Sequence, residues 1–404
     1  MILSRACALL LASTFLQSTA YAQSGEVRRA FAKPIAIDRP TGMISLPLEE
    51  RGGKLYISAL IEGTSGTFIF DTGSPTMLSK DLATQLGLKI IGQNTGVDAN
   101  GTPVTTEIAV IDEINLGGIR FQNVPVTVFD FASVPMGPCI IGDGIIGSEL
   151  LPRSAWRIDL DREMIDIAPS AAEFGEDESQ QEAPLTPAGY PHMPIVGYSV
   201  NGFSDNALFD TGNAGSVVLF KEITKDRQVR KAIKRGSDQR GRGSEGVSAG
   251  GMGAEVDLRR FELEGFKIGP NDIGAVTATT RQVPPTLIGT GLLAKSVVVL
   301  DYPAGAFRWH PRQSPQKKQP HQGFGVSFVE GKAQVVQLYD GSAAKKAGLK
   351  LGDEVLSLSK RSASANTDEE RCDHLRWLIS APEAAQATSV TVLRNGQPKT
   401  FDLK

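Results

Sequence analysis

The sequence predicts an all-β-dominated protein, with two β-barrel lobes related by a pseudo-twofold axis and a smaller α+β domain at the C-terminal end. Two observations lead to this prediction. A short motif occurs twice in matched surroundings, and a polar segment at residues 313–322 precedes a stretch with a different pattern. A length of 404 residues is too great for one core, and 41% hydrophobic with 22% charged residues is ordinary for a globular protein.

Residues 1–22 are expected to be a cleaved export signal. A basic residue precedes the apolar run from Ala6 to Leu16, and Ala20 and Ala22 provide the small residues of a signal-peptidase site. No later segment approaches the length of a membrane-spanning helix, so no membrane span is expected. The sequence therefore predicts an exported protein.

The number of cysteines and the net charge limit which cellular compartment and which classes of binding partner are expected. Cys7 leaves with the signal, and Cys139 and Cys372 remain, so no disulfide framework is expected. A large exported protein without disulfides fits a bacterial periplasm. The formal net charge of −3 argues against nucleic acid as a partner. The four histidines show no metal-ligand spacing, so neither a metal nor another cofactor is expected.

The repeated motif is Asp-Thr-Gly followed by a polar residue. Its two copies are Asp71-Thr72-Gly73-Ser74 and Asp210-Thr211-Gly212-Asn213. Each copy follows an apolar strand, and a glycine eight residues before the Asp marks a hairpin. A second shared segment ends in two apolar residues and a glycine, at Gly147 and at Gly289. Such a long internal repeat indicates a duplicated domain, with lobes expected at 23–187 and 188–312.

These features resemble the aspartic proteases, and within them the retropepsin-like form written twice in one chain. That family places its Asp-Thr-Gly on a tight loop after a buried strand, crossed by a strand that ends in two apolar residues and Gly. The resemblance covers roughly residues 45–312. It implies that Asp71 and Asp210 meet as a catalytic dyad of an aspartic-type endopeptidase whose substrate is a polypeptide.

Two carboxylates at one site can supply both functions that peptide hydrolysis needs. A base must activate a water molecule while an acid protonates the carbonyl oxygen. Because two adjacent carboxylates cannot both ionise easily, the pair shares a proton. Gly73 and Gly212 let the backbone approach closely. The resemblance also implies that the hydroxyls of Thr72 and Thr211 reach the backbone of the opposite lobe.

The fourth position of the motif differs between the copies. In the family, a serine there bonds the outer oxygen of its Asp, a pattern that Ser74 matches and Asn213 does not. Because a hydroxyl donor favours the charged carboxylate, Asp71 is expected to be the base and Asp210 the proton carrier. The two groups titrate as a unit.

Glycine-rich segments lie within both halves, at residues 92–102 and 241–253. Such hairpins suit mobile flaps that close over a substrate and exclude water. Surface hairpins without a gating function are the alternative. Neither segment carries the aromatic residue of a pepsin flap, which favours the retropepsin-like form.

Two segments are expected to be linkers. Residues 170–187 are acidic and rich in Pro and Ala, and residues 313–322 are polar. After the second linker, residues 323–404 resemble a PDZ domain, on the Phe-Gly-Val-Ser-Phe segment at 324–328 and the Gly-Asp-Glu-Val-Leu segment at 352–356. The polar linker predicts that this domain folds independently.

The PDZ resemblance implies a groove that binds the C-terminal peptide of a substrate or adaptor as an added strand. The residues implied for it are Phe324, Gly325 and Val326 on the strand and Cys372, Leu375, Arg376 and Ile379 on the facing helix. A groove covered by the protease lobes is the alternative.

Three functional hypotheses follow. The first is a monomeric periplasmic aspartic endopeptidase that cleaves exported proteins or periplasmic segments of membrane proteins, with substrate or adaptor bound by the PDZ domain. The second is a catalytically silent scaffold that binds peptides. The third is a homodimeric protease that uses only the first lobe and pairs Asp71 between two copies.

Overall fold

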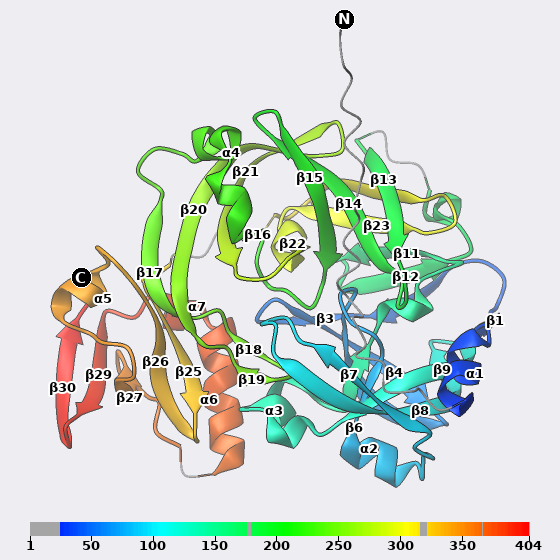
Figure 1. Cartoon of the computed structure of the whole chain (residues 1–404), viewed down its shortest axis with the longest axis horizontal. Helices are drawn as coiled ribbons and strands as arrows, with labels where there is room; N and C mark the ends of the chain where they lie inside the picture. The colour runs from blue at the N-terminus through cyan, green and yellow to red at the C-terminus, as the bar shows by residue number, and fades with distance from the viewer. Residues whose placement is uncertain (1–24, 176–178, 316–320, 366, 404) are drawn as a thin grey trace, which may run out of the picture.

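A computed structural model describes residues 25–175, 179–315, 321–365 and 367–403. The expected export signal at 1–22 lies outside these residues. Strands dominate, in two similar lobes and a smaller C-terminal domain, so the predicted fold class is confirmed (Figure 1). None of the described helices is long and apolar enough to cross a membrane.

The first lobe is a sheet in which the strand before Asp71 lies in the middle. Its strands are β1 (Ala36–Asp38), β3 (Glu49–Arg51), β4 (Lys54–Ile61), β5 (Thr64–Phe70), β6 (Met77–Ser79), β7 (Gly92–Val97), β8 (Pro103–Leu116), β9 (Ile119–Phe129) and β10 (Gly144–Ile146). The helices of this part are α1 (Gly25–Ala32), α2 (Lys80–Gln85) and α3 (Gly137–Ile141), with the 3-10 turns η1 (Phe131–Ser133) and η2 (Ser148–Leu150).

The second lobe repeats this arrangement. Its elements are β14 (Met193–Val200), β15 (Phe203–Asp210), β16 (Val217–Phe220), η4 (Lys221–Lys225), α4 (Arg227–Ala232), β17 (Gln239–Ser244), β18 (Val247–Ser248), β19 (Gly251–Met252), β20 (Glu255–Ile268), β21 (Asn271–Arg281), β22 (Thr286–Gly289) and η5 (Thr290–Leu292). In both lobes the strand before the motif pairs in parallel with the apolar-Gly strand: β5 with β10, and β15 with β22.

A shared sheet joins the lobes. It contains β2 (Ile44–Pro47), β11 (Ala155–Asp159), β12 (Met164–Ala168), β13 (Gln181–Ala188), β23 (Ser296–Asp301) and β24 (Ala306–Pro311), with η3 (Ala171–Phe174) beside it. Strands β11 and β23 come from corresponding places in the two halves and pair antiparallel. One hydrophobic core extends through both lobes, with Trp156 stacked on Phe70.

The first expected linker is partly wrong. Residues 181–188 form β13, whose first half, residues 181–184, pairs with β24 and whose second half, residues 185–188, pairs with β14. Only Ala183 and Leu185 of this strand are buried apolar residues. Because the other positions are largely polar or proline, the composition resembles that of a linker.

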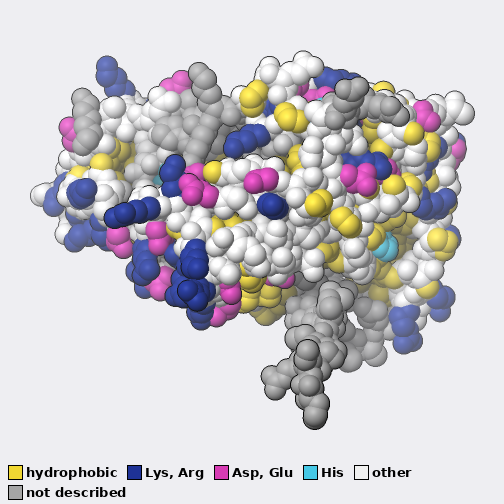
Figure 2. All heavy atoms as spheres, turned by 90° about the horizontal axis from the view of Figure 1, so that it is seen from above, with side chains coloured by type: hydrophobic (Ala, Val, Ile, Leu, Met, Phe, Trp, Pro, Cys, Tyr) yellow, Lys and Arg dark blue, Asp and Glu magenta, His cyan; other side chains and the backbone are white. Residues whose placement is uncertain are grey.

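The C-terminal domain is a small α+β unit with its own core. Its elements are β25 (Phe324–Val329), β26 (Lys332–Tyr339), α5 (Ala343–Ala347), β27 (Glu354–Leu358), β28 (Arg361–Ser362), α6 (Asp368–Ser380), α7 (Pro382–Ala385), β29 (Ser389–Arg394) and β30 (Gln397–Asp402). It lies beside β17 of the second lobe, with α6 next to α3 of the first (Figure 1). On the face seen in Figure 2, acidic and basic side chains are interspersed.

Candidate active site

The two motif aspartates lie at the ends of central strands of their lobes. Asp71 directly follows β5, and its backbone N–H donates to the carbonyl of Ile146 on β10 at 3.0 Å. Asp210 ends β15 and is in register with Gly289 at the end of β22. Each aspartate is therefore placed by the pair of parallel strands that the two repeated sequence segments encode.

The threonines of the motifs join the two lobes by reciprocal hydrogen bonds. The hydroxyl of Thr72 donates to the carbonyl of Phe209 at 2.6 Å and accepts from the N–H of Thr211 at 3.1 Å. The hydroxyl of Thr211 donates to the carbonyl of Phe70 at 2.7 Å and accepts from the N–H of Thr72 at 3.0 Å. Both threonines are fully buried. The expectation that these hydroxyls reach the opposite lobe is confirmed.

The motif glycines bring the two carboxyl groups face to face. The N–H of Gly73 donates to Asp71, and that of Gly212 donates to Asp210, each at 2.8 Å. A Cβ on Gly73 would lie 2.6 Å from the carboxyl carbon of Asp210, and one on Gly212 would lie 2.3 Å from a carboxyl oxygen of Asp71. A side chain at either glycine would therefore collide with the opposite aspartate.

The surroundings of the pair favour one bound proton. Desolvation, and then the negative charge of Asp71, raise the pKa of Asp210 to about 7. A hydrogen bond between the two carboxyl groups acts in the same direction. Lys54 and Arg281 oppose this shift by their positive charges. A pair that shares a proton can act as base and acid together.

Ser74 does not make the contact that the family pattern implies. Its hydroxyl donates to the carbonyl of Pro75 at 2.9 Å, not to Asp71. The expected tuning of Asp71 by this serine is therefore wrong for this structure. Burial and the proximity of the two carboxyl groups, not the serine, are the leading causes that raise the pKa of Asp210.

The loops after the two motifs are supported differently. In the first lobe, the carboxylate of Glu149 accepts from the N–H of Thr76 at 2.8 Å. Glu149 is 3% exposed, and burial raises its pKa to about 7. In the second lobe, Asn213 accepts from the N–H of Gly215, the residue that corresponds to Thr76, at 2.7 Å. Asn213 therefore supplies within its own loop the acceptor that the first lobe takes from a distant glutamate.

The second lobe has no space for a counterpart of Glu149. The corresponding position is Gly291, where a Cβ would lie 2.5 Å from the hydroxyl of Ser216. Because a side chain at Gly291 would collide with Ser216, the acceptor for the N–H of Gly215 comes from Asn213.

The two glycine-rich segments are hairpins whose tips meet. The carboxylate of Asp98 in the β7–β8 hairpin accepts from the N–H of Gly250 at 2.8 Å, and the N–H of Ala99 donates to the hydroxyl of Ser248 at 3.2 Å. The guanidinium of Arg281, which is 6% exposed, donates to the carbonyl of Ala99 at 2.9 Å. The hairpins are therefore closed on each other beside the aspartate pair.

Lys54, Glu149 and Arg281 are site residues that sequence analysis missed. The Nζ of Lys54 donates to the carbonyl of Gly212. Lys54 follows a Gly-Gly turn and Arg281 precedes a proline-containing turn, and neither context differs from ordinary turn chemistry. Glu149 could have been suspected, because it is the one acidic residue in an otherwise apolar and small segment after Gly147.

The predicted PDZ groove residues are engaged in contacts within the domain or with the first lobe. Phe324 is buried, and Gly325 and Val326 are half-buried on β25, which pairs with β26. On the helix side, Leu375 is in the core of the domain and Arg376 forms an ion pair with Asp373.

The remaining two helix residues face the first lobe. Cys372 is bonded to Cys139 of α3 in a disulfide, so the expectation that the cysteines form no disulfide is wrong. A Cβ on Gly52 would lie 2.7 Å from the side chain of Ile379, so this residue adjoins the β3–β4 turn. The C-terminal domain therefore contacts the first lobe through α6, and its independent folding stays a prediction.

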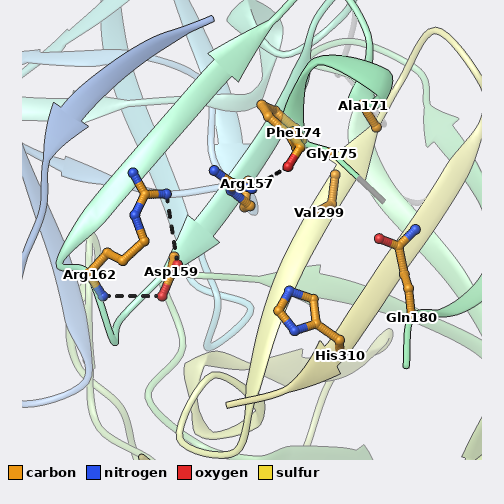
Figure 3. Close-up of a pocket in the computed structure, with 9 residues that line it drawn as sticks. All are labelled: Arg157, Asp159, Arg162, Ala171, Phe174, Gly175, Gln180, Val299 and His310. Carbon is orange, nitrogen blue, oxygen red and sulfur yellow. Dashed lines mark hydrogen bonds and ion pairs between the residues drawn. The ribbon is translucent and has the colours of Figure 1, made fainter. Parts of the chain in front are cut away.

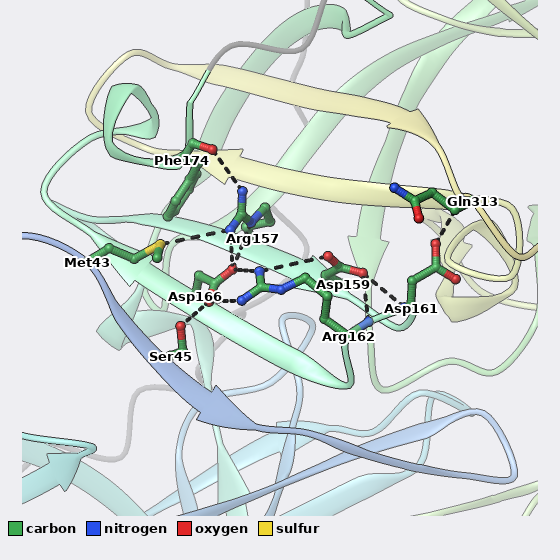
Figure 4. A network of polar contacts seen from close by, with 9 residues as sticks. All are labelled: Met43, Ser45, Arg157, Asp159, Asp161, Arg162, Asp166, Phe174 and Gln313. Carbon is green, nitrogen blue, oxygen red and sulfur yellow. Dashed lines mark hydrogen bonds and ion pairs between the residues drawn. The ribbon is translucent and has the colours of Figure 1, made fainter.

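A separate cavity of about 290 Å³ lies in the sheet that joins the lobes (Figure 3). Arg157, Arg162 and His310 are among its lining residues, and none of the residues that line it belongs to either motif. Both arginines pair with the fully buried Asp166, which also accepts from the hydroxyl of Ser45 (Figure 4). Because the charges satisfy one another, this network serves the structure of the sheet.

Among the residues that the structure describes, no three or more His, Cys, Asp or Glu side chains are grouped so that they could hold a metal ion. The polar groups at the centre of the protein are instead the paired carboxyls described above.

Comparisons with known proteins match two parts of the chain. Residues 57–150 match the family model described as "Aspartyl protease", and residues 321–404 match the model described as "PDZ domain". A curated protein of Ralstonia nicotianae, "Putative zinc metalloprotease RSc1411", is 29% identical over 80 residues. That match covers 20% of this chain and 16% of the length of the Ralstonia protein.

Among solved structures, a retropepsin-like aspartic protease from Rickettsia conorii matches with 22% identity and a TM-score of 0.23. The match covers 33% of this chain and 94% of the Rickettsia chain. The two family models therefore show an aspartyl-protease-like region in the first lobe and a PDZ-like domain at the C-terminal end of the chain.

Proposed function

We propose that the protein is an aspartic-type endopeptidase that hydrolyses peptide bonds with a water molecule activated by Asp71 and Asp210. The observation that carries this proposal is the pair of facing carboxyl groups, held by reciprocal threonine bonds between two lobes of one chain. In this mechanism Asp71 accepts a proton from the water while Asp210 donates one to the carbonyl oxygen of the substrate.

The same geometry favours one chain over a homodimer as the active unit. Asp71 already has a partner carboxyl in its own chain, and in the loop that follows Asp210 the side chain of Asn213 accepts from the N–H of Gly215. A silent scaffold would not need a desolvated carboxyl whose pKa is raised to about 7. We therefore favour a catalytically competent monomer.

Polypeptide substrates are the class that fits the site. An extended peptide would have to enter beneath the two hairpin tips, which therefore must separate first. We further propose that the protein acts in a bacterial periplasm on exported proteins or on periplasmic segments of membrane proteins. The signal pattern at 1–22 and the Cys139–Cys372 disulfide, a bond typical of oxidising compartments, support this location.

The test is cleavage of an unfolded protein by the wild type and by Asp71→Asn and Asp210→Asn. Each substitution should abolish cleavage and leave the fold intact, and a chelator should have no effect. Asp205→Asn is the matched control, because Asp205 is exposed on the same strand as Asp210. Activity retained in Asp210→Asn alone would favour the homodimer, and activity retained in both variants would end the protease proposal.

A further inference from the structure

The PDZ domain is part of the sheet that forms the second-lobe hairpin. Strand β26 pairs antiparallel with β17, with Gly241 opposite Tyr339 and Gly243 opposite Gln337. Beyond the paired residues, the N–H of Asp340 donates to the carbonyl of Arg240 at 2.7 Å. A PDZ strand thus covers the outer edge of β17, the side of the hairpin away from β20.

The glycines of β17 are explained by this contact. A Cβ on Gly241 would lie 2.5 Å from the carbonyl oxygen of Leu338, and a Cβ on Gly243 would lie 2.1 Å from that of Val336. The side chain of Gln337 donates to the carbonyl of Ser244 at 2.7 Å. The glycine content of this segment therefore allows the PDZ strand to approach closely, in addition to any flexibility it confers.

The same strand leads directly to the tip that closes the cleft. Ser244 ends β17, and the residues that follow form the small β18–β19 hairpin. That hairpin contacts the tip of the other flap through Ser248 and Gly250. A restraint on β17 consequently restrains the tip beside the aspartate pair.

The PDZ domain is also fastened to the first lobe. Cys139 of α3 and Cys372 of α6 form a disulfide. Met136 and Ile140, on either side of Cys139, pack against the PDZ core. Both cysteine residues are partly exposed, as attack by a soluble reductant requires.

We propose that Cys139–Cys372 is a redox-regulated modification site, and that its reduction by a dithiol releases the PDZ domain from the second-lobe flap and opens the cleft. This inference rests on the proposed peptidase function and concerns the control of that site. The oxidised form is the closed, less active form of the enzyme.

The chemistry is a thiol–disulfide exchange. A thiolate of the dithiol attacks one sulfur of the Cys139–Cys372 bond, which breaks and gives a mixed disulfide and one free cysteine thiolate. The second thiol of the reductant then displaces the other cysteine. Two electrons pass to the protein, the cysteines end as two thiols with two protons from the reductant or solvent, and the dithiol ends as a disulfide.

Reduction weakens docking because it removes a tether. With the disulfide intact, β26 is held at high effective concentration beside β17. After reduction, the peptide chain at residues 313–322 is the remaining covalent connection between the lobes and the domain, and the short strand pairing and the apolar contact of α6 with α3 must hold the docked position without the cross-link to the first lobe. Suppose that the cleft is open in about one molecule in ten while the disulfide is intact, and in nearly all molecules after reduction. Because only open molecules bind substrate, reduction should then raise kcat/KM by about tenfold.

Two readouts test the proposal on the mature full-length protein with and without a dithiol reductant. The first is hydrogen exchange of the β17 amides, and the second is cleavage of a short fluorogenic peptide. Reduction should speed exchange in residues 239–244 and raise kcat/KM about tenfold. A Cys139→Ser/Cys372→Ser variant should match the reduced protein whether or not reductant is present. Unchanged exchange on reduction, or a fall in peptidase activity, would overturn the proposal.

Gly241→Val provides a second route that leaves the disulfide intact. The added side chain collides with the backbone of β26, so this variant should open the flap in the oxidised protein. Gly197→Val is the control, because Gly197 lies on β14 of the same lobe, has no left-handed φ, and a Cβ there would meet only Asn206 Oδ1, at 3.9 Å. Thermal unfolding of both variants shows whether each keeps the stability of the wild type.

The two proposals fail in different ways. If no form of the protein cleaves any peptide, the peptidase function is wrong, and hydrogen exchange still decides whether the disulfide controls the flap. If activity is present but equal in oxidised, reduced and Gly241→Val proteins, the peptidase function stands and the redox proposal is wrong.

Discussion

The two lobes share a strand order and a motif, yet they support the loop after that motif in different ways. In the first lobe a buried glutamate, Glu149, binds the N–H of Thr76. In the second lobe Asn213 binds the equivalent N–H of Gly215 from within the loop. The asparagine at the fourth motif position therefore supplies the hydrogen-bond acceptor that Glu149 supplies in the first lobe.

The flaps of the two lobes differ as well. The outer strand of the first flap, β7, pairs only with β8 among the described strands. The outer strand of the second flap, β17, pairs with β20 and also with β26 of the PDZ domain. A duplicated fold has thus acquired one lobe whose flap has a free edge and one whose flap is restrained by another domain.

The largest loss of unfolding free energy should follow from substitution of the motif threonines, which make the same contacts in both lobes. Thr72→Val or Thr211→Val keeps the shape but leaves one buried carbonyl and one buried N–H of the opposite lobe without a partner. Each substitution should cost about 4 kcal/mol of unfolding free energy, measured by urea denaturation. Costs that differ by more than about 2 kcal/mol would show that the junction is not symmetric.

The second-largest loss of unfolding free energy should differ between the two lobes. Glu149→Ala leaves a cavity and an unpaired buried N–H, and should cost about 3 kcal/mol. Asn213→Ala removes the corresponding acceptor, but Asn213 is only half-buried, so water can replace it and the cost should be about 1 kcal/mol. Urea denaturation of both variants gives the comparison. Equal costs would contradict the different burial of the two acceptors.

Glu149 should also give stability a pH dependence that Asn213, which supplies the corresponding acceptor in the second lobe, cannot give because its amide does not titrate. The pKa of Glu149 in the folded protein is about 7, above its ordinary 4.5, so the native state binds more protons than the unfolded state between these values. Stability from this group is full below about pH 4.5 and falls as the pH rises to about 7. The fall is at most about 3 kcal/mol.

The corresponding measurement compares wild type with Glu149→Gln at pH 5 and pH 8. The neutral amide can still accept from Thr76 but does not titrate, so the variant should lose less stability over this range. Asp210 contributes a fall of the same sign in both proteins and cancels in the comparison. A parallel decline of the two proteins would show that Glu149 does not titrate there.

The smallest effect should be that of Ser74→Ala. The hydroxyl of Ser74 donates to the carbonyl of Pro75, so its loss should cost under about 1 kcal/mol and leave the acid limb of the pH-rate profile unchanged. A shift of that limb by about one pH unit would show that the serine bonds Asp71 in the working enzyme, as the family pattern implies.

The sequence could predict what depends on local chemistry and on the repeat. The motif positions, the strands before them and the reciprocal threonine bonds follow from residues close in sequence or from their duplicated counterparts. Position 74 shows the limit, because a hydroxyl can turn to either of two acceptors and the sequence does not select one.

Contacts between distant segments could not be predicted. Cys139 and Cys372 are 233 residues apart, and nothing near either indicates that α3 and α6 adjoin. The docking of β26 on β17 depends on the empty space at Gly241 and Gly243, which in the sequence indicates only flexibility. Strand β13 was missed because only two of its residues are apolar and buried.

The central claim is that both lobes of one chain form one active site. Isothermal titration with a peptide analogue that carries a hydroxyl group in place of the scissile carbonyl tests it directly. With and without a dithiol reductant, the wild type should bind one analogue per chain, and Asp71→Asn and Asp210→Asn should each lose this binding. One analogue for every two chains, or binding retained in Asp210→Asn, would contradict an active site shared by the two lobes.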